Sequence, residues 1–311
     1  MIPGFSERLE IILNQESNKQ RLGTIAALGA FTFWGMVPIY FKLLLSVSPL
    51  EIIIHRILWS SPVLAVFLLL RDGPGFWQRL RLPPRSVALL GLSGSLIAVN
   101  WLVYVWAVNH GQILATSLGY FISPLFNVML GVIFLKERLT TLQIAAVAIA
   151  AAGTAFMAWY LGIAPWISLA LVASIGFYVL LRKKLGVGPM VGLLWETLLL
   201  AVPALVYLLV MANQGEMVFA HAGLRIDVLL VLCGLITVLP LVWFNVAAHH
   251  LPLSRVGFIQ YLSPTITSVL AVFVYGEAFT LGHAIAFACI WIALALVSME
   301  SVLRKRPAGL G

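Results

Sequence analysis

The sequence carries little charge. Only 10% of its 311 residues are Asp, Glu, Lys or Arg and 62% are hydrophobic, whereas roughly 25% of the residues of a soluble domain are charged. A soluble chain of this composition would expose large apolar patches and aggregate. The scarcity of charge therefore excludes a soluble globular protein and predicts an integral membrane protein.

Cysteine is also scarce, and the motifs of several enzyme classes are missing. Cys233 and Cys289 each lie inside an apolar run, which predicts buried thiols rather than a disulfide or a zinc site. The sequence contains no phosphate-binding glycine loop, no HExxH pair and no GxSxG elbow. It therefore lacks the signatures of ATP hydrolysis, zinc proteolysis and serine hydrolysis. We expect no enzyme activity, no cofactor and no metal site.

Long apolar runs, in contrast, are plentiful. A helix of about 20 residues crosses the hydrocarbon core of a bilayer, and runs of this length predict an all-α integral membrane protein with ten transmembrane helices. The two longest connections, 71–85 and 212–226, leave no room for a soluble domain. The predicted spans are 22–45, 50–70, 86–108, 113–135, 141–160, 163–182, 189–211, 227–248, 254–275 and 281–302.

Basic residues in the connections predict the orientation. With the N-terminus inside, sixteen of the 19 Lys and Arg residues fall on the cytoplasmic side and Arg225 alone falls outside, in agreement with the positive-inside rule. Lys42 and Arg56 remain within spans. We expect a frayed cytoplasmic arm at 1–21, which lacks the layout of a secretory leader, and a cytoplasmic basic tail at 303–311. The net charge of +8 then indicates topology and predicts no nucleic-acid partner.

The chain repeats itself at a shift of 140 positions. Residues 107–140 align with 247–280 without a gap, and the same shift places Pro49 on Pro189. Each half holds five spans, an odd number, so the second half must be inverted relative to the first. Inverted repeats place a site at the membrane midplane that either half can close, the architecture of alternating access. The predicted five-helix repeats are 22–160 and 163–302.

One face of the fourth span is polar. Tyr120, Pro124 and Asn127 recur at steps of four and three and so share a helix face. Pro124, and Pro264 at the equivalent position of the ninth span, each remove a backbone hydrogen bond and predict a helix break. Such a stripe can bind helices together. Because both symmetric spans carry it, we favour the lining of a cavity.

Amides and aromatic rings with polar tips occur in other central spans. They suit an amphipathic ligand or a cation, although aromatic residues also form belts at membrane interfaces. The predicted substrate-binding residues are Trp34, Tyr40, Asn100, Tyr104, Tyr120, Asn127, Tyr178, Asn245, Gln260 and Tyr261.

Ionisable side chains inside spans indicate function by default, because charge is costly in lipid. Arg56 lies in the second span, about 9 Å from its start, and the shift of 140 positions makes Glu196 its equivalent. We predict that both lie near gates, where they bind a charged group of the substrate or pair in one state. His55 is a candidate proton-responsive group, and its spacing from Glu51 lets the two pair.

Several segments are distinctive in combination: "FWGMVPIYFK", "EIIIHRILWS", "NWLVYVWAVN", "SLGYFISPLFNVMLGVIFLKER", "ETLLLAVP" and "GFIQYLSPT…YGE". Together they resemble the RarD permeases, a branch of the EamA-type drug/metabolite transporter superfamily, over residues 22 to 298. The resemblance implies a multi-pass protein of the bacterial inner membrane in which spans five and ten stand aside from the cavity. That superfamily moves amino acids, drugs, nucleotide sugars and sugar phosphates, commonly outward.

We therefore predict a secondary transporter, an exporter of small amphipathic metabolites such as amino acids or aromatic compounds, that works by alternating access. The alternatives are an importer or facilitator of organic anions or sugar phosphates, a lipid scramblase or structural membrane subunit, and an intramembrane enzyme. The expected partners are a small-molecule substrate and membrane lipids. The sequence leaves open the substrate's identity, the coupling to protons or another ion, and a homodimer.

Overall fold

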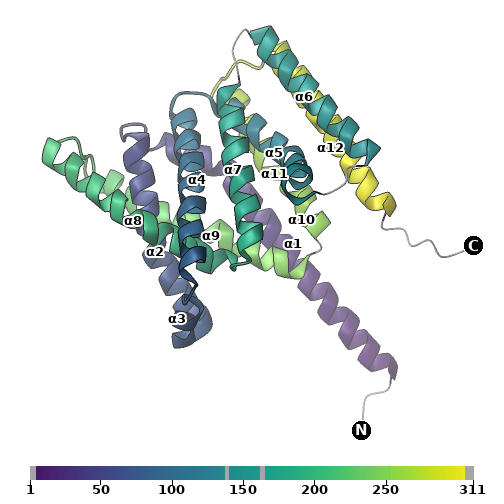
Figure 1. Ribbon diagram of the computed structural model, residues 1–311, viewed down its shortest axis with the longest axis horizontal. Coiled ribbons are helices and arrows are strands. Elements are labelled where there is room, and N and C mark those ends of the chain that lie inside the picture. The colour runs from purple at the N-terminus through teal and green to yellow at the C-terminus, as the bar shows by residue number, and fades with distance from the viewer. Residues whose placement is uncertain (1–4, 137–139, 162–164, 252, 305–311) are drawn as a thin grey trace, which may run out of the picture.

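The computed structural model describes residues 5–136, 140–161, 165–251 and 253–304, which are helical almost throughout and contain no β-strand (Figure 1). The helices in chain order are α1 (Phe5–Lys42), α2 (Pro49–Asp72), η1 (Gly73–Gly75), α3 (Phe76–Arg79), α4 (Pro84–Asn109), α5 (Ile113–Leu135), α6 (Thr141–Leu161), α7 (Trp166–Leu185), α8 (Pro189–Gln214), α9 (Leu224–His250), α10 (Leu253–Ile259), α11 (Leu262–Val269), the π-helical η2 (Leu270–Val274) and α12 (Leu281–Arg304).

Local sequence signals set the helix ends. The side chain of Ser48 accepts a hydrogen bond of 3.2 Å from the N–H of Glu51, and Pro49 begins α2. An N-cap serine followed by proline is a strong start signal, and α8 likewise begins at a proline, Pro189. Gly186 ends α7 at a φ of 65°, the left-handed conformation that glycine tolerates best. The connection between α7 and α8 is therefore short, running from Gly186 to Gly188.

The all-α membrane fold predicted from the sequence is confirmed. Nine segments of the described residues are long and apolar enough to cross a membrane, and Leu281–Leu296 of α12 is a shorter apolar segment. These segments correspond to the predicted spans. Helices suit this setting because each satisfies its own backbone hydrogen bonds where water is absent.

The fourth and ninth spans, in which Pro124 and Pro264 predict a helix break, differ. The ninth span, Arg255–Val274, combines α10, α11 and η2, with a turn at Gln260 and Tyr261. Pro264 has no N–H to donate to the carbonyl of Gln260, which accounts for the turn. α5, however, continues through Pro124, so the break predicted there is not formed. A single missing backbone bond is tolerated inside a packed span.

α1 begins earlier than the first predicted span. It starts at Phe5, and its N-terminal part projects from the bundle (Figure 1), so the segment expected to be a frayed arm is helical from that residue on. No glycine or proline interrupts the stretch from Phe5 to Leu22, and its Glu, Leu, Gln and Lys residues favour helix. Residues 1–4 and most of the basic tail, from 305 on, lie outside the described residues.

Helix packing repeats when the two halves are exchanged. α1 packs on α9 and α11, and its equivalent α7 packs on α4 and α5. α2 packs on α9 as α8 packs on α4, and three equivalent pairs meet each other: α2 with α8, α5 with α11, and α6 with α12. Contacts that map onto themselves under exchange define a pseudo-two-fold axis, as expected of inverted repeats.

α6 and α12 form a pair that stands at the side of the bundle (Figure 1). Gly153 of α6 lets the two backbones approach, because a Cβ atom there would lie 2.5 Å from Cβ of Cys289 in α12. The pair contacts the rest of the bundle mainly through α5. A site shared by both halves must therefore lie among the remaining helices.

The bundle has two distinguishable ends. One end carries Arg71, Arg79 and the α7–α8 connection, which border a common pocket, and we call it the basic end. The other end carries the α8–α9 connection, whose backbone contacts Glu51 at the start of α2. We call this the opposite end.

Candidate functional site

Arg56 of α2 lies inside the bundle against three other helices. Its guanidinium carbon is 4.0 Å from the ring centroid of Trp101 in α4 and 5.9 Å from that of Phe41 in α1. Its Nε donates a hydrogen bond of 2.8 Å to Oγ1 of Thr237 in α9. A cation–π stack and one hydrogen bond thus hold the guanidinium. Within the described ranges, no carboxylate forms an ion pair with it.

Aromatic rings continue from this cation into α4 and α5. The ring centroids of Phe41 and Tyr104 are 6.2 Å apart, and those of Tyr104 and Tyr120 are 5.9 Å apart. The Tyr120 hydroxyl donates to Oδ1 of Asn100 at 3.1 Å. Asn100 in turn donates to α7, to Oγ of Ser174 and to a backbone carbonyl, each at 3.0 Å. Asn100 therefore links Tyr120 to α7 and fixes the position of the Tyr120 phenol.

Tyr40 of α1 borders the same region from the side of α9. Its hydroxyl donates to the carbonyl of Leu229 and lies 3.6 Å from Sγ of Cys233. The hydroxyl of Thr237 donates to the carbonyl of Cys233 at 2.9 Å while accepting from Arg56. Cys233 thus contacts both Tyr40 and Thr237, the residue that accepts the hydrogen bond from Arg56. We name the following set the central cluster: Tyr40, Phe41, Arg56, Trp101, Tyr104 and Tyr120.

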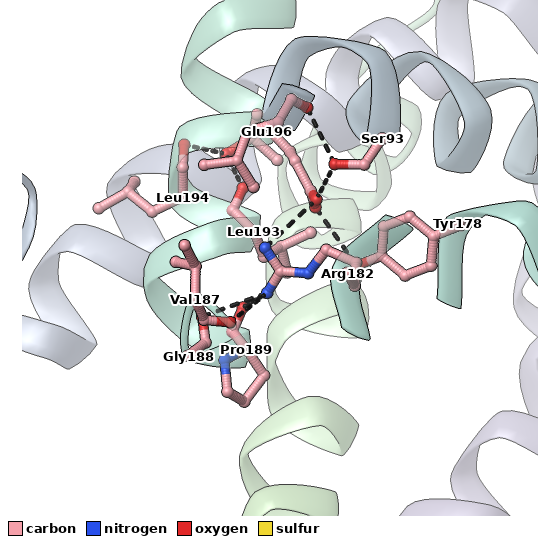
Figure 2. A network of polar contacts seen from close by, with 11 residues as sticks. Ser93, Tyr178, Arg182, Val187, Gly188, Pro189, Leu193, Leu194 and Glu196 are labelled. Atoms are coloured by element: carbon pink, nitrogen blue, oxygen red, sulfur yellow. Dashed lines mark hydrogen bonds and ion pairs between the residues drawn. The ribbon is translucent and has the colours of Figure 1, made fainter. Parts of the chain in front are cut away.

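A second polar network surrounds Glu196 of α8 (Figure 2). Oγ of Ser93 donates to Oε1 at 2.6 Å, and the hydroxyl of Tyr178 donates to Oε2 at 3.3 Å. Nη1 of Arg182 lies 3.5 Å from Oε1 of the same carboxylate. Nη2 of Arg182 donates to the carbonyls of residues 187–189 at 3.2 to 3.3 Å. Figure 2 shows the guanidinium between the carboxylate and these carbonyls, so it joins α7, α8 and their connection.

This ion pair is buried. Glu196 is 0% exposed and the side chain of Arg182 is 11% exposed. Gly192 makes room for the guanidinium, because a Cβ atom at that position would lie 1.5 Å from Nη1 of Arg182. Removing one partner of a buried pair leaves a charge without compensation and is strongly destabilising. The Glu196 network therefore holds the helices together at the basic end.

Arg56 and Glu196 occupy equivalent positions but have different surroundings. The shift of 140 positions relates Lys42 to Arg182 and Cys233 to Ser93. Glu196 pairs with Arg182 of its own half and accepts a hydrogen bond from Ser93 of the first half, so it does not pair with Arg56. In the first half, the Lys42 ammonium lies 5.4 Å from the ring centroid of Tyr275. One half thus contains a neutral pair, and the other contains two cations.

Glu51 and His55 lie where α2 meets the α8–α9 connection. Oε1 of Glu51 accepts hydrogen bonds of 2.9 Å from the N–H groups of Val218 and Phe219. Nδ1 of His55 accepts from Nε1 of Trp59 at 3.1 Å, and its Nε2 is buried without a hydrogen-bond partner. The pairing of Glu51 with His55 that their spacing allows is not formed, because backbone and indole donors take their place.

Glu277 closes another contact at the opposite end. Its two carboxylate oxygens accept hydrogen bonds of 2.7 Å from the N–H groups of Ile113 and Leu114, at the start of α5. These N–H groups have no acceptor within the helix, and the helix dipole favours an anion there. Burial raises the pKa of the Glu277 carboxyl, while the two N–H groups and the charge of Lys42 oppose that rise.

A pocket of about 440 Å³ opens at the basic end. Its walls include Arg71, Arg79, residues 186–191 and Asn245. Both arginines bind Asp72, at 2.7 and 3.2 Å. Asn245, which was predicted to bind substrate, therefore lies in this pocket rather than in the central cluster.

Asn127 lies in a smaller pocket of about 110 Å³ between α5 and α7, bordered by Gly176. Its Oδ1 is buried without a hydrogen-bond partner. The polar face of α5 thus serves several neighbours. Oγ of Ser117 donates to the carbonyl of Pro264 in α11 at 2.7 Å, Tyr120 reaches α4, and Asn127 turns to α7.

Three further predicted residues have their own partners. Trp34 packs on Phe244 with ring centroids 5.9 Å apart, and Tyr261 stacks with Phe121 at 6.3 Å. Gln260 lies in the turn between α10 and α11. These contacts place the three residues among α1, α5 and α9 to α11, and their assignment to substrate stays a prediction.

Sequence reasoning missed Arg182 and Ser93. Arg182 was counted with the basic residues of a connection, although its equivalence to Lys42, a charged residue within a span, was a usable signal. Ser93 gives no such signal, because a single serine in an apolar span forms no pattern. The structure shows that both residues bind Glu196.

Comparisons with known proteins agree with this architecture. The EamA-like transporter family matches residues 21–159 and again residues 164–299. An uncharacterized transporter of Pseudomonas aeruginosa is 46% identical over 289 residues, covering 92% of this chain and 97% of that protein. Protein RarD of Escherichia coli is 38% identical over 291 residues, covering 94% and 98%. The chloramphenicol-sensitive protein RarD of Pseudomonas aeruginosa is 34% identical over 294 residues, covering 91% and 96%.

A solved crystal structure matches with a TM-score of 0.60 over 92% of this chain and 99% of that chain, at 18% sequence identity, which shows the fold alone. Two repeated halves of apolar helices, each matched by the EamA-like transporter family, define a multi-pass membrane transporter. The chain belongs to the EamA-like transporter family, and its relatives include the RarD proteins. It is a multi-pass inner-membrane protein that acts on a small molecule.

Proposed function

We propose that the protein is a secondary transporter that exports small amphipathic metabolites, such as amino acids or aromatic compounds, by alternating access. The observation that carries this proposal is the exchange symmetry of the helix contacts, which relates Arg56 to Glu196 across the two halves. Two inverted halves around one site can exchange open and closed conformations at the two ends.

The networks at the two ends would act as the gates. Opening the basic end would separate α7 from α8 and break the contact between Arg182 and Glu196. Opening the opposite end would free the start of α5 from Glu277 and move Lys42 from Tyr275. Each network joins different helices, so one can open while the other stays closed.

The basic end would face the cytoplasm. Positively charged connections are retained on that side of bacterial membranes, and the arginines of the 71–85 connection lie at this end. The pocket of about 440 Å³ would then be the cytoplasmic vestibule, from which an exported solute starts. Both chain termini would lie on the same side.

The central cluster would form the binding surface. Its phenols and indole offer apolar faces with polar tips, which suit an amphipathic solute. We propose no catalytic step, in keeping with the transporter family that matches the chain and with the transporter names of some relatives.

Counterflow of radiolabelled phenylalanine into proteoliposomes tests this proposal. Tyr120→Ala and Asn100→Ala should each lower the initial rate at least ~10-fold, because they remove a ring of the cluster or the group that fixes it. Tyr207→Ala is the matched control, since Tyr207 is 46% exposed on the outside of α8. Equal loss in all three folded variants would contradict the assignment of the central cluster.

Import of organic anions is the second candidate, and the unpaired charge of Arg56 favours it. Substrate uptake into right-side-out and inverted membrane vesicles distinguishes the directions. Export predicts accumulation in inverted vesicles alone, whereas import predicts accumulation in right-side-out vesicles alone.

A further inference from the structure

Arg56 uses few of its hydrogen-bond donors. A guanidinium has five N–H groups, and here the group on Nε binds Thr237. In the part of the chain that the structure describes, Nη1 and Nη2 have no protein acceptor, and the side chain remains partly accessible. Cζ of the guanidinium lies 4.0 Å from the ring centroid of Trp101, a cation–π contact that uses none of the N–H donors. The outer edge of the guanidinium, formed by Nη1 and Nη2, therefore remains available to a ligand.

Four carboxylates in or beside the spans are held by groups other than Arg56. Glu196 is bound by Arg182 and Ser93. Glu51 and Glu277 accept from backbone N–H groups. Oδ1 of Asp227 accepts from the N–H of Ala220 at 2.8 Å. A cation inside a span without a counter-ion is costly, so an anionic ligand gains free energy by binding there.

The geometry of the site selects the kind of anion. Nη1 and Nη2 form a planar fork that matches the two oxygens of a carboxylate. A phosphate monoester would bring nearly two negative charges, and the nearest basic residue of α1, Lys42, is placed over Tyr275. One guanidinium therefore suits a single negative charge.

Aromatic rings lie next to the guanidinium, and Phe41 and Tyr104 among them are buried. Phe41 lies beside the guanidinium, and Tyr104 and Tyr120 follow from it at centroid separations of 6.2 and 5.9 Å. Flat apolar groups pack well against such rings, and the phenols can meet a polar substituent.

We propose that the substrate is a monocarboxylate with an aromatic or apolar body, whose carboxylate binds the outer edge of Arg56 while the body lies against Tyr104 and Tyr120. This inference rests on the proposed function, because it names the substrate class of the same site. Amino acids and simple aryl acids share this chemistry.

Thermal stabilisation of the purified full-length protein in detergent tests the inference. A ligand that binds only the folded state raises Tm according to its concentration relative to Kd. Phenylacetate and phenylalanine should raise Tm, whereas 2-phenylethanol, the uncharged analogue, and phenyl phosphate should need at least ~10-fold higher concentrations. Stabilisation by phenylacetate without phenylalanine would restrict the class to simple acids.

Substitutions locate the effect. Arg56→Gln should weaken the binding of phenylacetate at least ~10-fold and leave the binding of 2-phenylethanol unchanged, because only the contact with the charged group is removed. The affinity of Arg56→Lys for phenylacetate should lie between those of the unaltered protein and Arg56→Gln, since lysine keeps the charge but lacks the planar fork of donors. Arg85→Gln, at an exposed position of the basic end, is the matched control. If Arg56→Gln does not fold, the inference is still tested by comparing how phenylacetate and 2-phenylethanol stabilise the unaltered protein.

Equal stabilisation by phenylacetate and 2-phenylethanol, or by phenyl phosphate alone, would overturn the inference. Phenylalanine counterflow that Tyr120→Ala abolishes but Arg56→Gln leaves unchanged would also overturn it. That result would be consistent with the proposed transport function but would show that the carboxylate of the substrate does not bind Arg56. Absence of both stabilisation and counterflow in the unaltered protein would count against the proposed function as well.

Discussion

Nη1 of Arg182 lies 3.5 Å from Oε1 of Glu196, and the repeat places Lys42 and Arg56 at the two equivalent positions of the other half. A position that carries an acid in one half therefore carries a base in the other. This difference makes the pseudo-symmetric halves chemically unequal. In one half, the ion pair of Arg182 and Glu196 holds the basic end together. In the other half, the Arg56 cation has no such partner and is available to a ligand.

Breaking the buried pair should destabilise the protein. Glu196→Ala leaves the Arg182 guanidinium buried without its counter-ion, and the expected loss is about 3–5 kcal/mol in the free energy of unfolding. Ser93→Ala removes one hydrogen bond to a charged group and should cost about 1.5–3 kcal/mol. Thermal or denaturant unfolding in detergent measures both.

Glu216→Gln is the control for this series, because Glu216 is an exposed carboxylate and such surface substitutions stay within about 0.5 kcal/mol. An Arg182→Glu/Glu196→Arg double variant should recover part of the loss that either single variant shows. A loss no larger for Glu196→Ala than for Glu216→Gln would remove the ion pair from the account of stability.

A single methyl group should reproduce the loss of the pair. Gly192→Ala places a Cβ atom 1.5 Å from Nη1 of Arg182 and must displace the guanidinium, whereas Gly188→Ala meets no atom within 4 Å. We expect Gly192→Ala to lower Tm by several degrees and Gly188→Ala to leave it nearly unchanged. If the two variants melt together, Arg182 does not occupy the position described.

The pH dependence of stability should report Glu277. Its folded-state pKa is raised above the ordinary 4.5 by burial, so the folded protein binds this proton more readily than the unfolded chain does. The stabilisation from this group is then present at low pH and is lost as the pH rises from 4.5 through the raised pKa. Glu277→Gln should remove that contribution.

Melting curves of the unaltered protein and Glu277→Gln, recorded from pH 4.5 upward, measure this difference. The unaltered protein should lose stability relative to the variant as the pH rises. Parallel profiles of the two proteins would show that the carboxyl titrates alike in the folded and unfolded states.

Substitution of Glu51 should loosen the opposite end without affecting the basic end. Glu51→Ala removes the acceptor of two backbone N–H groups in the α8–α9 connection, and each such charge-assisted bond contributes about 1.5–3 kcal/mol. Amide hydrogen exchange should therefore quicken at Val218 and Phe219 while the α7–α8 connection keeps its protection. Equal acceleration at both ends would indicate global destabilisation instead.

Much of the fold was predictable because two strong signals act together. Long apolar runs specify the spans, and the 140-residue shift that relates Pro49 to Pro189 specifies the repeat. The same shift predicted that Arg56 and Glu196 are equivalent, but a one-dimensional register says nothing of their partners. Those depend on where a long side chain reaches, as Arg182 does from the last turn of α7.

The polar stripe of α5 shows that helix periodicity alone does not predict which residues share a site. Tyr120 and Asn127 share a face in sequence, yet Tyr120 bonds to α4 and Asn127 turns to a pocket beside α7. Three helices pack against successive turns of one face, so common periodicity does not imply a common site. Pro124 likewise predicts a missing bond but not whether packing keeps the helix continuous.

Alternating access to the central cluster is the central claim, and labelling of a cysteine at position 120 tests it most directly. A Tyr120→Cys variant with Cys233 and Cys289 replaced would be treated with a membrane-impermeant maleimide in right-side-out and in inverted vesicles. The account predicts labelling from both sides. Labelling from one side only, or from neither while a lipid-soluble maleimide reacts, would contradict it.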